Sequence, residues 1–292
     1  MNILTYDIEE WALVKDKGSV AEKKCAEYDK YLKRILELLE ACGVKATFFC
    51  TGMMAKKYPE VLKLIFDRGH EIGCHSLRHT WMNKMSVTEA REDTHAAVDA
   101  IEQCVGHKVL SYRAPAFSIG ENNKWMFDVL CENGIERDSS IFPVARDFGG
   151  FPGFSHKEPC IIDYNGLNIK EFPICTTRLF GKEVAYSGGG YFRFFPLWFS
   201  KSQLKKSTYS MCYFHIGDLI PENHGVLSKT EYEAYFKEPG TLKARYIRHI
   251  KSNLGKKGAW NKMEQLISSN HFLNIQDFDE KISWNTVPTL KL

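Results

Sequence analysis

The sequence lacks any long, uncharged hydrophobic run. No part of it approaches the stretch of about 18 apolar residues that a membrane-spanning helix needs. A first strand that begins at about Asn2 also leaves no room for the charged and apolar parts of a signal peptide. We therefore expect a cytoplasmic protein without a transmembrane segment, and peripheral contact with the inner face of the membrane stays open.

The chain also lacks a strong excess of charge and a paired-cysteine framework. Lys and Arg number 39 against 36 Asp and Glu, a net charge of +3 that offers no broad electrostatic footprint for nucleic acid. The nine cysteines lie in apolar surroundings and include no C-x-x-C pair. This use of cysteine indicates buried thiols in a reducing compartment. The small net charge, in turn, means that we do not expect nucleic acid as a partner.

Two common hydrolase motifs are absent as well. The sequence contains no H-E-x-x-H, which marks many zinc proteases, and no G-x-S-x-G, which marks Ser-His-Asp hydrolases of the α/β type. Nothing in it specifies a nucleotide cofactor.

What the sequence does contain is a regular alternation of strand and helix patterns. Apolar strand-like runs occur at about 2–7, 45–50, 71–74, 107–112 and 135–138, with amphipathic helical spacing between them. This alternation predicts an α/β protein with a parallel sheet wound with helices, and 292 residues suit one domain over 1–292.

The pattern changes in the second half of the chain. Asn165-Gly166 between two apolar runs predicts a β hairpin, which we interpret as an inserted antiparallel ribbon over about 159–175. A late strand is expected at 210–214, a charged helical part at about 229–270, and a last strand at 272–278.

Polar side chains gather at or just past the predicted strand ends. They are Asp7, Glu9, Glu10, His75, His79, Arg113, Asp138 and His215. The carboxyl ends of parallel strands meet at one edge, so these side chains are expected to converge. One carboxylate and two imidazoles form a three-ligand site for a divalent metal, which can lower the pKa of a bound water to about 7. A second carboxylate could then act as base and a separate histidine as acid, an arrangement that suits hydrolysis.

Five short motifs resemble those of the polysaccharide deacetylase family (carbohydrate esterase family 4), in the family's order. They are Tyr6-Asp7-Ile8-Glu9-Glu10, His75-Ser76-Leu77-Arg78-His79, Arg113-Ala114-Pro115, Asp138-Ser139-Ser140-Ile141-Phe142-Pro143 and Phe214-His215. The resemblance runs from Leu4 to about Phe278. The amino-acid sequence at 7–11, 113–118 and 188–193 is most similar to that of a subgroup associated with exopolysaccharide gene clusters.

The resemblance implies a distorted (β/α) barrel of about seven strands or fewer. It also implies hydrolysis of an N-acetyl group from an N-acetylhexosamine-containing glycan or polysaccharide precursor. Asp7 would be the base, Arg113 would pair with it, and His215 would protonate the departing amine. His75 and His79 would hold one divalent metal, with zinc as the first candidate and Co, Ni or Fe as alternatives.

The first motif departs from the family pattern of two adjacent aspartates. Strand alternation puts residues 7 and 9 on the same side, so we favour Glu9 as the third metal ligand and place Glu10 behind it. A bulge in the strand would favour Glu10 instead. Asp138 is assigned a supporting role behind the site, through Arg113 or His215.

Four residues are predicted to contact the substrate, namely Trp11, Pro115, Tyr191 and Arg193. Aromatic rings stack on pyranose faces and an arginine can bind hydroxyl groups, which fits the glycine-rich segment 188–193. If Arg193 contacts the substrate, its replacement by alanine should raise KM more than it lowers kcat.

Two alternative functions remain. One is a deformylase or linear-amide hydrolase that acts on a small, nucleotide-linked or lipid-linked sugar, since metal, base and acid do not define the acyl acceptor. The other is a catalytically silent glycan-binding relative whose altered first motif no longer activates water. A homo-oligomer is also left open.

Overall fold

The computed structural model describes residues 1–15, 17–146, 149–221, 225–236 and 238–292. Its strands are β1 (Asn2–Ile8), β2 (Thr47–Cys50), β3 (Glu71–Cys74), β4 (Ser111–Tyr112), β5 (Arg137–Asp138), β6 (Cys160–Tyr164), β7 (Leu167–Glu171), β8 (Thr176–Leu179), β9 (Lys182–Ala185), β10 (Ser210–His215), β11 (Phe272–Leu273) and β12 (Thr289–Lys291).

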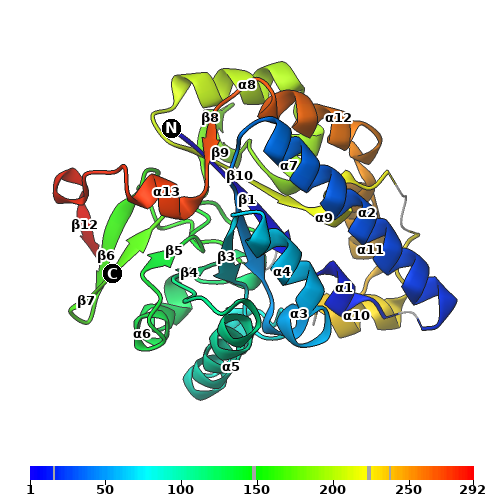
Figure 1. Ribbon diagram of the computed structural model, residues 1–292, viewed down its shortest axis with the longest axis horizontal. Helices are drawn as coiled ribbons and strands as arrows, with labels where there is room; N and C mark the ends of the chain where they lie inside the picture. Colours follow the sequence, from blue (N-terminus) through cyan, green and yellow to red (C-terminus); the bar gives the residue numbers. More distant parts are fainter. Residues whose placement is uncertain (16, 147–148, 222–224, 237) are drawn as a thin grey trace.

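The helices surround the sheet, as Figure 1 shows. They are α1 (Glu10–Leu13), α2 (Ser19–Ala41), α3 (Gly52–Lys57), α4 (Pro59–Asp67), α5 (Val87–Val105), α6 (Met126–Glu132), α7 (Gly189–Phe194), α8 (Leu197–Lys206), α9 (Ile216–Leu219), α10 (Lys229–Phe236), α11 (Leu242–Asn253), α12 (Lys256–Ile267) and α13 (Ile275–Asp279). Short 3₁₀ turns lie at Met82–Lys84, Pro115–Phe117, Glu121–Asn123 and Trp284–Thr286.

One large, mostly parallel sheet confirms the predicted α/β class. Its strand order is β10-β1-β2-β3-β4-β5-β7-β6-β12, with β11 also paired to β1. Every neighbouring pair from β10 to β7 is parallel. The described residues form a sheet of ten strands, which includes the hairpin strands β6 and β7 as well as β11 and β12, so the expected barrel of about seven strands or fewer is not confirmed. The sequence patterns missed β12, and they merged β11 with the helix that follows it.

No strand pairing in the described part of the chain closes this sheet into a barrel. Side chains join β10 to the segment that follows β7. The amide of Met211 donates to Sγ of Cys175 at 3.0 Å, and the hydroxyl of Tyr209 donates to the carbonyl of Pro173 at 2.8 Å. In the described part of the chain, β10 therefore contacts the segment after β7 without a hydrogen-bonded ladder between them.

The predicted hairpin forms, but it is not an insertion apart from the sheet. β6 and β7 pair antiparallel around Asn165 and Gly166, whose φ angles of 53° and 82° suit a two-residue hairpin turn. β7 also pairs parallel with β5, which makes the ribbon part of the main sheet. A second hairpin, β8–β9, was not predicted because its turn at Phe180 carries no asparagine or proline signal.

The predicted helical part at 229–270 corresponds to α10, α11 and α12. The last predicted strand is wrong beyond Leu273, because the side chain of Asn274 accepts a hydrogen bond from the amide of Asp277 and starts α13. Within the described ranges, no helix is both long enough and apolar enough to cross a membrane.

Candidate active site

The central strand β1 carries the acidic residues of the site. Successive side chains on a strand point to opposite faces, so Thr5 and Asp7 lie on one side, and Glu9 continues that side just past the strand end. Asp7 is buried, and it is in register with His215 at the end of the neighbouring strand β10. Two elements far apart in the chain thus bring these side chains together.

Glu9 lies with both histidines of the second motif. Its Oε2 is 2.6 Å from Nε2 of His79 and 3.3 Å from Nε2 of His75. Among the described residues, this is the one cluster of potential metal ligands whose donor atoms lie close enough to share an ion. Burial disfavours ionisation of Glu9, but the charge of His79 and the close approach of both imidazoles hold its pKa well below the ordinary value.

The donor atoms of this cluster fit a divalent metal. Oε2 of Glu9 and Nε2 of His75 are buried without a hydrogen-bond partner, which is costly unless something else satisfies them. Nδ1 of His75 lies 2.7 Å from the carbonyl oxygen of Arg113. Because the carbonyl only accepts, Nδ1 carries the proton and Nε2 keeps its lone pair for an ion.

His75 and His79 are brought together by a turn rather than a helix. Ser76 and His79 have φ angles of 63° and 60°, a left-handed conformation that side chains other than glycine seldom adopt. Oγ of Ser76 accepts a hydrogen bond from the amide of His79, and Asp93 of α5 accepts one from the amide of Leu77. These bonds hold the turn so that the two imidazole centroids lie 5.2 Å apart.

Arg113 connects the acidic residues to the rest of the site. It follows β4, is fully buried, and donates from Nη1 to Oδ1 of Asp7 and to Oγ1 of Thr5, each at 2.8 Å. Its Nη2 donates to Oγ of Ser139 at 3.0 Å. One residue therefore orients Asp7 through its side chain and His75 through its carbonyl.

His215 lies beside the acidic residues, at the end of the neighbouring strand β10. Its Nε2 is 3.6 Å from Oδ2 of Asp7 and 4.0 Å from Oε1 of Glu9, and its Nδ1 is 3.2 Å from Oδ2 of Asp218. Burial alone would lower its pKa, but the hydrogen bond and charge of Asp218 and the charges of Asp7 and Glu9 raise it to about 10. His215 is therefore held protonated.

The sequence patterns missed Asp218. It lies in the first turn of α9, three residues after His215, and also accepts from the His215 amide at 3.4 Å. Burial would raise its pKa, but His215 and then Arg193 outweigh that effect and lower it. One sequence signal could have revealed Asp218 as the partner of His215: an acidic residue three positions after a histidine at a strand end.

The other predicted supporting residues lie behind the site. Oε1 of Glu10 accepts from the amide of Gly217 at 2.8 Å and does not join the histidines, while burial and the charge of Glu9 raise the Glu10 pKa to about 7. Oδ1 of Asp138 accepts from Oγ of Ser140, which in turn accepts from the amide of Ala114 at 2.8 Å. Asp138 thus supports the backbone beside Arg113 rather than His215.

Two predicted substrate contacts are corrected by the structure. Trp11 points from α1 into the core, where its Nε1 donates to Asp29 at 2.9 Å and its ring packs on Tyr28. Pro115 is buried in a 3₁₀ turn, where its carbonyl accepts from Ser118. Neither residue lines the cavity over the acidic cluster, so neither can stack on a substrate there.

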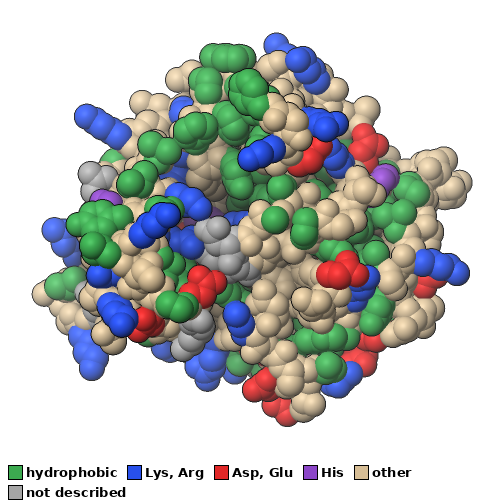
Figure 2. Space-filling model, turned by 180° about the vertical axis from the view of Figure 1, so that it is seen from behind, with side chains coloured by type: hydrophobic (Ala, Val, Ile, Leu, Met, Phe, Trp, Pro, Cys, Tyr) green, Lys and Arg blue, Asp and Glu red, His purple; other side chains and the backbone are tan. Residues whose placement is uncertain are grey.

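A cavity of about 720 Å³ opens over this cluster. Figure 2 shows the face with the helices α7, α10 and α11, hollowed near its centre and with Lys and Arg side chains close to the hollow. The lining includes both predicted contacts of the glycine-rich segment, and also aromatic residues that no motif predicted: Asp7, Glu9, His79, Trp81, Phe117, Tyr191, Arg193, Phe194, Tyr213, His215, Asp218, Tyr235, Phe236, Arg248 and Leu254.

Arg193 lines the cavity, but its guanidinium is occupied by protein groups. Nη1 donates to the carbonyl of Ser252 at 2.7 Å, Nη2 donates to the carbonyl of Lys251 at 3.3 Å, and Nε lies 3.4 Å from Oδ1 of Asp218. Arg193 thus links the end of α11 to the partner of His215, and its predicted contact with the substrate stays a prediction.

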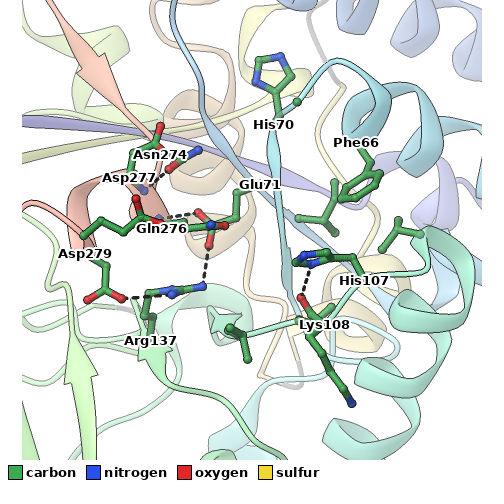
Figure 3. A pocket seen from close by; sticks show the side chains of 16 residues that line it. Phe66, His70, Glu71, His107, Lys108, Arg137, Asn274, Gln276, Asp277 and Asp279 are labelled. Carbon is green, nitrogen blue, oxygen red and sulfur yellow. Dashed lines mark hydrogen bonds and ion pairs between the residues drawn. The ribbon is translucent and has the colours of Figure 1, made fainter.

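A second cavity, of about 550 Å³, lies near the opposite ends of the strands. Figure 3 shows Arg137 between Glu71 and Asp279, at 3.5 Å and 3.2 Å. Glu71 also accepts from hydroxyl groups of Thr47 and Ser111, each at 2.6 Å. These polar groups satisfy one another, so we interpret this network as a structural clamp where β3 and β5 begin.

Comparison with known proteins gives two family matches along the chain. Residues 6–136 match the family model described as "Polysaccharide deacetylase", and residues 139–279 match one described as "Domain of unknown function (DUF3473)". The candidate ligands Glu9, His75 and His79 lie in the first match. His215 and Asp218 lie in the second, so the cavity draws on both.

Curated relatives align with part of the chain. A peptidoglycan-N-acetylglucosamine deacetylase of Bacillus cereus is 32% identical over 160 residues, which cover 51% of this chain and 54% of that protein. The peptidoglycan-N-acetylmuramic acid deacetylase PdaC of Bacillus subtilis is 33% identical over 88 residues, which cover 30% of this chain and 19% of that protein. The alignments thus span about half or less of each relative.

A solved structure agrees over the whole fold. The crystal structure described as "putative polysaccharide deacetylase from Mycobacterium smegmatis" matches with a TM-score of 0.63 at 16% identity, covering 100% of this chain and 92% of that one. At this identity the likeness concerns the fold alone. The family match and these relatives together show that residues 6–136 of this chain are similar to polysaccharide deacetylases, while the solved structure shows a shared fold.

Proposed function

We propose that this protein is a metal-dependent hydrolase that removes the N-acetyl group from an N-acetylhexosamine in a glycan or polysaccharide precursor. One observation carries the proposal. The cluster Glu9-His75-His79, with its unsatisfied buried donor atoms, lies beside a carboxylate and a protonated histidine that belong to different strands. The ligands Glu9 and His79, the base Asp7 and the acid His215 then line one cavity.

Glu9, His75 and His79 would hold one divalent metal, with zinc as the first candidate. Two imidazole nitrogens and one carboxylate oxygen suit zinc, and they also accept Co, Ni or Fe. A metal bound there would polarise the acyl carbonyl and lower the pKa of a water molecule. Glu9 would take the place of an aspartate of the family pattern, and it lies just past the end of β1.

Asp7 would take the proton from the attacking water. Arg113 occupies Oδ1 of Asp7, so Oδ2 is the oxygen that remains toward the cavity and His215. The fixed Arg113 guanidinium keeps this orientation without reorganisation during the reaction, which is the physical basis of efficient proton transfer.

His215 would donate the proton that releases the amine. Asp218 accepts from Nδ1, so the proton on Nε2 faces the acidic residues and the cavity. The raised pKa of His215, about 10, keeps this proton in place until nitrogen of the departing amine accepts it. Base and acid then lie side by side, with 3.6 Å between Nε2 of His215 and Oδ2 of Asp7.

The substrate class follows from the cavity and the relatives. Tyr191, Tyr213 and Trp81 offer aromatic surface beside the cluster, as expected for pyranose rings. The named relatives act on N-acetylglucosamine and N-acetylmuramic acid of peptidoglycan. We propose that the substrate is an N-acetylated glycan precursor carried on a lipid or nucleotide. The amino-acid sequence at 188–193 supports a role in exopolysaccharide biosynthesis.

The first experiment measures metal content together with release of acetate or formate from N-acylated sugars. We expect about one divalent metal per chain and release of acetate. Asp7→Asn should keep the metal and lose about 10²–10⁴-fold in rate. Release of formate alone would favour the deformylase. Protein that binds no metal after reconstitution would favour the silent glycan-binding relative.

A further inference from the structure

Helix α11 presents its apolar side to solvent. Leu242, Tyr246 and Ile250 follow one another at intervals of four residues and are 62%, 51% and 59% exposed, and Ile247 and Leu254 lie beside this line. No residue of α11, which the structure describes in full, is buried. An ordinary surface helix buries its apolar side against the core, whereas α11 turns its apolar side toward solvent.

The opposite side of α11 makes the contact with the protein. Ala244 packs against the small cluster of Trp81 and Phe236, and the guanidinium of Arg248 lies 4.4 Å from the centroid of Phe236. The end of the helix is fixed by Arg193, whose Nη1 donates to the carbonyl of Ser252. The exposed stripe is therefore held in place by the fold and does not result from a loosely attached helix.

The stripe extends toward the mouth of the active-site cavity. Leu254 and Phe194 both line the cavity, and Phe194 is 63% exposed. Trp198, in the first turn of α8, is 70% exposed. We call these seven residues the apolar rim: Phe194, Trp198, Leu242, Tyr246, Ile247, Ile250 and Leu254. Figure 2 shows hydrophobic side chains next to Lys and Arg over α8 and α11.

The chain around the apolar rim contains cations and no carboxylates. No Asp or Glu occurs between Glu183 and Asp218, and none occurs between Glu238 and Glu264. These two segments contain the exposed lysines Lys205, Lys206, Lys243, Lys251 and Lys257, together with further cations that are partly or fully buried, among them Arg193 and Lys256. In a chain whose net charge is only +3, this separation creates a local positive surface around exposed aliphatic groups.

We propose that the apolar rim docks the protein onto an anionic lipid bilayer. Exposed Leu, Ile, Phe and Trp side chains would enter the boundary between headgroups and acyl chains, while the lysines would meet lipid phosphates. The mouth of the cavity would then lie at headgroup level. This inference concerns where the protein binds and does not depend on the reaction proposed for the cavity.

Other occupants fit these observations less well. A second copy of the chain would bring the same cations face to face across a two-fold axis, without carboxylates to pair them. A soluble anionic glycan would use the cations, but it would leave the aliphatic Leu242, Ile247 and Ile250 without a role, since sugars stack on flat aromatic faces. A bilayer uses both features.

The test is sedimentation of the full chain with phosphatidylcholine vesicles that contain about 30% phosphatidylglycerol, compared with phosphatidylcholine alone. We expect binding to the anionic vesicles and at least about tenfold weaker binding to the neutral ones. Trp198→Ser combined with Ile250→Ser should weaken binding at least about tenfold, because two large apolar groups no longer leave water. Lys243→Glu combined with Lys257→Glu should do the same.

Matched controls lie on the hairpin β8–β9, which contributes no residue to the apolar rim. Phe180 is fully exposed and Lys182 is exposed beside it, and neither lines the cavity. Phe180→Ser combined with Lys182→Glu should leave vesicle binding unchanged. All replaced side chains are exposed, and circular dichroism would verify that each variant folds.

Three results would overturn the proposal. The first is absence of vesicle binding by the wild type. The second is equal loss in the hairpin control. The third is loss on charge reversal with no effect of the serine variants, which would indicate a soluble polyanion. A dimer in solution that the serine variants dissociate, seen by light scattering without vesicle binding, would assign the rim to a second copy instead.

Discussion

Oδ2 of Asp218 lies 3.2 Å from Nδ1 of His215, while Oδ1 of the same carboxylate lies 3.4 Å from Nε of Arg193. Asp218 thus binds the imidazole with one oxygen and a buried guanidinium with the other. The arrangement fixes which ring nitrogen of His215 faces the cavity, because Nδ1 is already engaged. Three residues from β10, α9 and α7 form a connected chain behind the proposed acid.

Replacing Asp218 by asparagine should lower kcat more than it changes KM. The amide has the same shape and keeps an oxygen for the His215 amide, but it no longer holds the imidazolium by charge. We expect a loss of about 10–100-fold in kcat with metal content unchanged. Steady-state kinetics on an N-acetylated oligosaccharide would measure both constants. A raised KM with normal kcat would show that Asp218 contacts the substrate instead.

Arg193→Ala should also act mainly on kcat. The guanidinium binds Asp218 and the last carbonyls of α11, so its loss would free the partner of His215. We expect kcat to fall by about tenfold or more, and Arg193→Lys to recover part of it because the charge near Asp218 remains. Tyr191→Phe in the same cavity is the comparison, since it keeps the ring and leaves this link intact. A rise in KM larger than the fall in kcat would instead support the prediction that Arg193 contacts the substrate.

Glu9 and Glu10 provide a matched pair for the metal site. Glu9→Gln should weaken metal binding at least about 100-fold, because the amide cannot supply the negative oxygen between His75 and His79. Glu10→Gln should keep the metal, since Glu10 accepts from Gly217 behind the site. Metal titration with a fluorescent competitor would compare the two without relying on activity. Equal loss in both variants would contradict the assignment of Glu9 as ligand.

The convergence of polar residues could be predicted because it follows from strand polarity. Asp7, His75, Arg113 and His215 each stand at or just after the carboxyl end of a strand, and parallel strands bring those ends to one edge. The preference for Glu9 over Glu10 rested on the two-residue period of a strand. The structure places Glu9 with the histidines and Glu10 behind them.

What the sequence could not provide was the direction of side chains outside regular strands. Trp11 follows the acidic motif directly, yet a single helical turn points it into the core toward Asp29. Tyr235 and Phe236 reach the cavity from α10, which no motif marks, because its place over the site depends on packing between distant segments. The partner of His215 was equally hidden, since the motifs offered Asp138 as a possible support and did not mark Asp218, which binds Nδ1 of His215.

Asp138 forms a buried pair with Glu171 of β7. Burial raises the pKa of Asp138 from an ordinary 3.8 to about 6, and burial together with the charge of Asp138 raises the pKa of Glu171 well above its usual value. Oδ2 of Asp138 and Oε2 of Glu171 have no hydrogen-bond donor from the rest of the described protein. A proton shared by the two carboxyl groups satisfies both oxygens.

This pair should make stability fall as pH rises. Because the folded state holds the Asp138 proton up to about pH 6 and the unfolded chain releases it near 3.8, the stabilisation is complete below that lower value and is lost as pH rises to about 6. Asp138→Asn lacks this titration. Urea unfolding of both proteins across the same range should show the wild-type advantage shrinking by roughly 2–3 kcal/mol. A constant difference would mean that Asp138 is ionised throughout.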